Sequence, residues 1–145
     1  MKGGERLELA RRYVEKWQPR MNLSNWKVYV SETDEDDEGE VARISVISRE
    51  YVATIMLPSD FARRRTDYAH PGETEEQTVE RSVVHELAHL VENRDWSSLY
   101  SEIDRAEETI GIPSSLRRAS AEIHENMAHY LERTLIQADR DGTSW

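Results

Sequence analysis

The run His85-Glu86-Leu87-Ala88-His89 constrains the fold more than any other segment, because a helix brings its two histidines together on one face. On an α-helix of 3.6 residues per turn, positions i and i+4 lie one turn apart, so both imidazoles can reach one metal ion. The surrounding apolar residues are Val83, Val84, Leu87, Leu90 and Val91. They predict that the helix packs against a core. We therefore predict a helix from near Thr74 to about Asn93 that presents two metal-binding histidines.

Glu86 projects beside the two histidines and is the acidic residue of the His-Glu-x-x-His pattern. There a carboxylate can take a proton from a zinc-activated water and pass it to a departing amine. The pattern therefore predicts a Zn²⁺ site and peptide hydrolysis with Glu86 as the general base. The alternative is that His85 and His89 are exposed or internally hydrogen-bonded histidines on an amphipathic helix, without a metal.

A catalytic zinc ion has three protein ligands and an open position for water, so a further side chain must complete the site. The segment around Glu125 is the best source, because Glu125 shares a helical face with the small residue Ala128 and with Leu131 or Glu132. A small residue next to a carboxylate permits the close approach of two helices. We therefore predict that Glu125 is the third ligand.

Two other carboxylates remain open as third ligands. Glu122 lies one turn before Glu125 on nearly the same face. Asp95 stands where metzincin peptidases place a ligand, but Glu92 replaces the glycine that would make the required turn. His124 and His129 are five residues apart, which separates them by about 140° around a helix, so they cannot form a second zinc pair with each other.

Composition excludes several classes of function. The chain has no cysteine, which excludes disulfides, a thiolate zinc site and a cysteine nucleophile. Its net charge of -10 argues against general binding to nucleic acid or anionic membranes, since both require a cationic face. No run of eighteen apolar residues and no apolar signal core are present. We predict one domain over residues 1–145, cytoplasmic, with no nucleic-acid or membrane partner.

The remaining periodicities predict an α+β fold. The predicted elements are a helix over 5–18, strands over 26–30, 41–47 and 51–57, a short helix through Arg65, the motif helix, and helices over 98–109 and 114–138, with 95–98 interrupting the helical region. The strands should form an antiparallel or mixed sheet backed by helices. The acidic segment 33–40 suits a hairpin between the first two strands. It also resembles the start of a calcium-binding loop, but position twelve is Ser45 rather than a bidentate glutamate.

The chain resembles the small gluzincin-type zinc metallopeptidases, the minigluzincins, and especially the metallopeptidase domains found in prophage regions. The likeness rests on the helix leading to 26–30, the strand 51–57, the run 84–89 and the segment 125–128. It implies a zincin-like fold, zinc on His85, His89 and Glu125, and Glu86 as general base. It further implies that the strand 51–57 is the sheet edge along the cleft, where a peptide or protein substrate adds as a strand.

Other parts of the mechanism stay open. A second donor to the oxyanion is usual in such sites, and the candidates are Tyr100, His124, His129 and Tyr130. A rival function is a zinc-bearing peptide-binding or regulatory module without efficient turnover, whose sequence would look the same. A structural zinc site is disfavoured, because such sites are usually closed by four ligands and rich in cysteine. The sequence does not indicate the oligomeric state.

Overall fold

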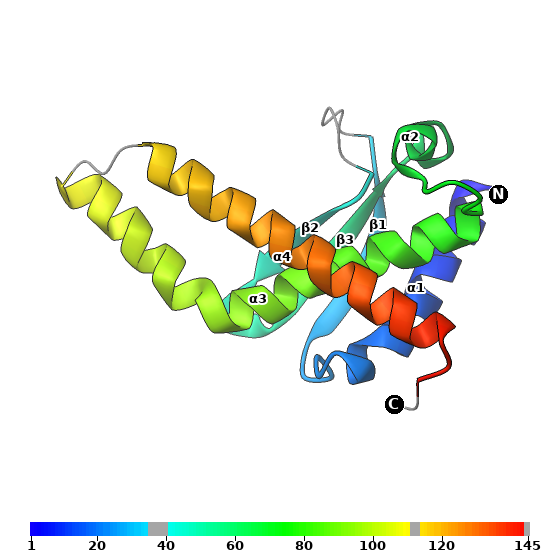
Figure 1. Ribbon diagram of the computed structural model, residues 1–145, viewed down its shortest axis with the longest axis horizontal. Helices are drawn as coiled ribbons and strands as arrows, with labels where there is room; N and C mark the ends of the chain where they lie inside the picture. The colour runs from blue at the N-terminus through cyan, green and yellow to red at the C-terminus, as the bar shows by residue number, and fades with distance from the viewer. Residues whose placement is uncertain (35–40, 111–113, 144–145) are drawn as a thin grey trace.

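The computed structural model describes residues 1–34, 41–110 and 114–143, and their side chains except at 92–104, 106–117 and 120. The elements are α1 (Gly3–Arg20), β1 (Lys27–Thr33), β2 (Arg43–Ile47), the short η1 turn (Ser48–Glu50), β3 (Val52–Pro58), α2 (Phe61–Tyr68), α3 (Glu75–Ile110) and α4 (Ser114–Arg140). This order confirms the predicted α+β class. Helix α1 packs on β1 and α3, α3 packs on β2, and α4 crosses over α3 (Figure 1).

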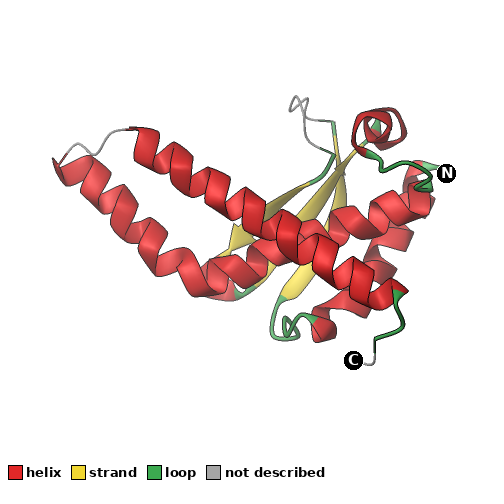
Figure 2. Cartoon of the chain, viewed as in Figure 1, coloured by secondary structure: helices red, strands yellow, loops and turns green. Residues whose placement is uncertain are grey.

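The three strands form one mixed sheet in the order β1-β3-β2, drawn in yellow in Figure 2. Strand β3 is parallel to β1 and antiparallel to β2. The predicted hairpin between β1 and β2 is therefore wrong, because β3 lies between them. A connection much longer than a two-residue turn does not force neighbouring strands to pair. Residues 35–40, and with them most of the calcium-loop pattern, lie outside the described residues; Ser45 is in β2.

The prediction that the strand 51–57 is the sheet edge is also wrong, since β3 is paired on both sides. The physical reason is burial: Ala53, Ile55 and Leu57 are buried on the helix side of the sheet, as expected of a central strand. Among the described strands, β1 and β2 are the edges. These inward side chains join Trp17 of α1 and Phe61 of α2 in one apolar core that supports the motif helix.

Helix α3 begins with a capping box and runs without a break. The backbone N–H of Gln77 donates to Thr74 Oγ1 at 3.1 Å, and the N–H of Thr74 donates to Gln77 Oε1 at 2.9 Å. The predicted interruption at 95–98 is wrong, because α3 is helical from Glu75 to Ile110. That range contains neither proline nor glycine. The other weak helix formers cost less than about 1 kcal/mol each, which is too little to end a helix by itself.

The far halves of α3 and α4 run together away from the sheet (Figure 1). The metal motif lies in the near half of α3, where the helix contacts the sheet and α4 together. Within the described part of the chain, none of the helices combines the length and the apolar content that a membrane span requires.

Asp139 of α4 forms ion pairs that connect α4 to α1. Its Oδ2 lies 2.9 Å from Lys16 Nζ and its Oδ1 lies 2.7 Å from Arg20 Nη1. Burial alone would raise the pKa of Asp139, but the two cations outweigh it and hold the pKa below its ordinary value. The ionised carboxylate therefore stabilises the packing of α4 on α1.

We expect Asp139→Asn to lower the free energy of unfolding by about 1 kcal/mol at neutral pH. Because the folded pKa is lowered, this contribution is complete above the unfolded pKa of about 3.9 and is lost as the pH falls through the folded value. Urea unfolding at neutral pH measures the loss in free energy of unfolding. Urea unfolding near pH 3 measures how far the contribution of Asp139 has disappeared in acid. Asp141→Asn, two residues away and exposed, is the control. An equal loss of free energy of unfolding in Asp141→Asn would indicate an effect of overall charge and not of the Asp139 ion pairs.

Candidate metal site

Helix α3 fixes the motif histidines by burying the residues around them. Val84, Leu87 and Ala88 are fully buried. The side chains of His85 and His89 lie on the face of α3 toward α4, where they are only 13% and 21% exposed. Their ring centroids are 5.0 Å apart. The i, i+4 spacing thus brings the two imidazoles together as predicted.

Helix α4 brings Glu125 between these imidazoles. Glu125 Oε1 lies 2.9 Å from His85 Nε2, and Oε2 lies 3.3 Å from His89 Nε2. The fully buried Ala128 faces α3 one turn later, so the small residue permits the close helix approach that the sequence predicted. His85, His89 and Glu125 form a group that could hold a metal ion.

The other two candidates for a third ligand have no such support. Glu122 is exposed and belongs to neither of the two His/Glu groups found among the described residues. The side chain of Asp95 lies outside those described. The backbone of α3 is helical through this position, however, and does not make the turn that a metzincin-like ligand requires.

The donor separations suit a small tetrahedral ion. Zinc bonds of about 2.0 Å place neighbouring ligand atoms about 3.3 Å apart, close to the separations between Glu125 and the two histidines. Hydrogen bonds from His85 and His89 hold the pKa of Glu125 well below its usual range. Burial would lower the pKa of His85, but Glu125 and Glu132 outweigh it and raise the pKa to about 10. A metal would therefore displace a proton from His85.

A second group, His85, His129 and Glu132, could also hold a metal ion. Glu132 Oε2 lies 3.8 Å from His85 Nδ1 and 3.3 Å from His129 Nδ1. The other oxygen, Oε1, accepts a hydrogen bond from Arg81 Nη1 at 3.0 Å. A cation would be repelled by the guanidinium and would compete for the same imidazole as the first group, so this arrangement suits a metal less well.

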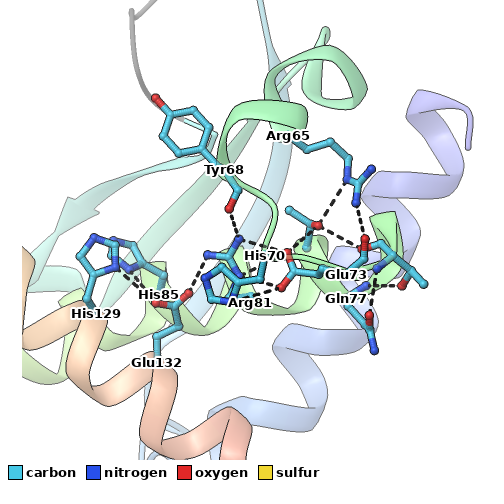
Figure 3. A network of polar contacts seen from close by, with 11 residues as sticks. Arg65, Tyr68, His70, Glu73, Gln77, Arg81, His85, His129 and Glu132 are labelled. Atoms are coloured by element: carbon cyan, nitrogen blue, oxygen red, sulfur yellow. Dashed lines mark hydrogen bonds and ion pairs between the residues drawn. The ribbon is translucent and has the colours of Figure 1, made fainter.

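Sequence reasoning missed the polar network behind His85, drawn in Figure 3. Arg81 lies between the carboxylates of Glu132 and Glu73, whose side chains are only 2% and 3% exposed. The guanidinium also donates to the carbonyl of Tyr68 at 2.8 Å. One signal was available, since Arg81 precedes His85 by one helical turn. The partners at 73 and 132 are distant in sequence, so spacing could not pair them.

A pocket of about 510 Å³ opens over the metal group. Its walls include the edge strand β2, and Glu86, which is only 6% exposed, is in its lining. Of the predicted oxyanion donors, His124 and His129 line this pocket, and His124 stacks on His89 with centroids 6.1 Å apart. Tyr130 is 63% exposed and is absent from the described lining, and the side chain of Tyr100 lies outside those described. Sequence reasoning did not identify Tyr68, which also lines the pocket.

Comparisons with known proteins give no relative: the chain matches no protein-family model, no curated protein and no solved structure. The structure shows an α+β fold and a His/Glu group that could hold a metal ion.

Proposed function

We propose that this protein is a zinc-dependent metallopeptidase of the gluzincin type, with His85, His89 and Glu125 as the zinc ligands. The observation that carries the proposal is the convergence of two imidazole Nε2 atoms of α3 on a carboxylate of α4, within 2.9 and 3.3 Å, beside a pocket that Glu86 lines. The resemblance of these residues to the minigluzincins and the prophage metallopeptidase domains agrees with this assignment.

The ligand set favours a catalytic site. Imidazole and carboxylate donors suit zinc, and three protein ligands leave a position open, whereas structural sites are usually closed by four. When bound, zinc supplies Lewis-acid chemistry, which acidifies a water molecule and polarises a carbonyl group. The open pocket gives a substrate access to this position.

Glu86 is the proposed general base. It follows His85 directly on α3, so its carboxylate lies beside the ligands without being one of them, and burial at 6% exposure restricts its motion. Glu86 takes the proton of the attacking water and delivers it to the leaving amine. His124 and His129 lie on the pocket wall, where an imidazole N–H can donate to the developing oxyanion.

The substrate class we propose is an extended peptide or protein segment. Strand β2 is an edge of the described sheet, and residues 41–44 and 46 line the pocket. An edge strand offers unpaired backbone groups to an added strand, which gives affinity from main-chain hydrogen bonds and selectivity from side-chain pockets. A substrate strand would therefore add to β2 and not to residues 51–57.

Two measurements on the purified protein test the function. Native mass spectrometry should find one zinc ion per chain, and a peptide library should yield cleavage products that disappear after zinc is chelated. No zinc uptake, even with added metal, would reject the metallopeptidase. Zinc with saturable peptide binding and no products would support a peptide-binding or regulatory module instead.

A further inference from the structure

We propose that Arg81 is a positioning residue for the metal centre, and that it acts through Glu132 on the imidazole of His85. The inference rests on the zinc site proposed above. It concerns residues that are not among the three proposed ligands, and it assigns a role to a buried charge network beside the pocket (Figure 3).

The guanidinium of Arg81 has partners on three sides. Its Nε lies 3.0 Å from Glu73 Oε2, its Nη1 lies 3.0 Å from Glu132 Oε1, and its Nη2 donates to the Tyr68 carbonyl at 2.8 Å. Nη2 also reaches Glu73 Oε1 at 3.1 Å. The Arg81 side chain is 13% exposed, so these charged contacts are poorly screened by water. Arg81 is therefore held firmly in one orientation.

Glu132 connects Arg81 to the metal centre, because its two carboxylate oxygens have different partners. Oε1 is held by Arg81, which turns Oε2 toward two imidazoles, with Nδ1 of His129 at 3.3 Å and Nδ1 of His85 at 3.8 Å. This separation is that of an ion pair rather than a direct hydrogen bond. The negative charge on this side favours the tautomer that carries its proton on Nδ1, which leaves the lone pair of Nε2 for a metal. Nε2 of the same ring is the atom that faces Glu125.

Charge explains why this position requires an arginine. Glu73 and Glu132 are both buried, and Arg81 is the cation that contacts both of them. Without it, Glu132 would lose the cation that orients it, and Oε2 would no longer be held opposite Nδ1 of His85. A lysine ammonium has three donors on a compact head and cannot span both carboxylates and the Tyr68 carbonyl.

The alternative is a purely structural role, since Arg81 also joins α3 to α4, to the end of α2 and to the segment before α3. The two roles predict different results in the double variant Arg81→Met with Glu73→Gln. This pair removes one positive and one negative charge together. Glu132 remains a carboxylate in this variant but has lost the guanidinium that orients it toward His85.

The experiment measures zinc affinity by chelator competition, and thermal unfolding of the metal-free protein, for matched variants. Arg81→Met and Glu132→Gln should each weaken zinc binding by about 10–100-fold, while Glu122→Gln on the exposed face of α4 leaves it unchanged. The double variant should recover part of the unfolding temperature lost in Arg81→Met but keep the weak zinc binding. Arg81→Lys retains the charge and covers the case in which Arg81→Met does not fold; it should still weaken binding about tenfold.

Wild-type affinity in Arg81→Met or Arg81→Lys would overturn the inference, as would zinc affinity that recovers with stability in the double variant. These outcomes are separable from failure of the proposed function. If wild type takes up no zinc, the metallopeptidase itself fails. If wild type binds zinc and the Arg81 variants bind it equally well, only the positioning role is rejected.

Discussion

Replacing Glu125 by alanine should weaken zinc binding by more than about 100-fold, because the change removes a proposed ligand rather than a residue behind one. Both oxygens of this carboxylate face the motif histidines, at 2.9 and 3.3 Å from their Nε2 atoms. Two imidazoles alone leave the coordination of zinc incomplete. The folding of the variant should be little affected, since the Glu125 side chain is 51% exposed.

Glu122→Ala is the matched control. It removes a carboxylate from the same helix one turn earlier, and Glu122 is exposed and outside the His/Glu groups. Chelator competition on the two variants and wild type should therefore separate the carboxylates that sequence reasoning left open. If Glu122→Ala loses zinc and Glu125→Ala keeps it, the ligand assignment is wrong. Equal, tight binding in both would place the metal on other groups, with His129 and Glu132 as the next choice.

The parts of the site that sequence reasoning predicted are those encoded by local spacing. The distance between His85 and His89 along a helix depends only on helical geometry, and the apolar residues around them orient that helix toward the core. Glu125 was predicted from a further local cue, the small residue Ala128 on the same face, which the structure buries between α3 and α4. In each case the residues on which the prediction depends lie within one short segment of the chain.

The features that escaped prediction depend on contacts between distant segments. Helix α3 continues through Asp95, Trp96, Ser97 and Ser98, although these residues are weak helix formers. The order of the strands depends on which of them is most buried, and hence β3 is central. Arg81 joins Glu73 and Glu132 across the fold, so the network behind His85 has no signature in spacing alone.

Glu86→Gln should keep zinc and lose peptide hydrolysis by about 10²–10⁴-fold, which is the range of general acid–base catalysis. Glutamine has nearly the shape of glutamate, so the buried position tolerates it and the metal ligands are unchanged. The amide cannot accept the proton of water or return it to an amine. The measurement is product formation from a cleaved library peptide, followed by mass spectrometry at equal zinc content. Chelator-treated wild type gives the background.

The same variant distinguishes the peptidase from the peptide-binding module. In a peptidase, wild type converts the peptide to products, whereas Glu86→Gln should hold it intact, so binding becomes measurable only in the variant. In a binding module, both proteins should bind the peptide with equal affinity and neither should release products. Activity retained in zinc-loaded Glu86→Gln would show that another group accepts the proton. His124 and His129, on the pocket wall, would then be the residues to replace.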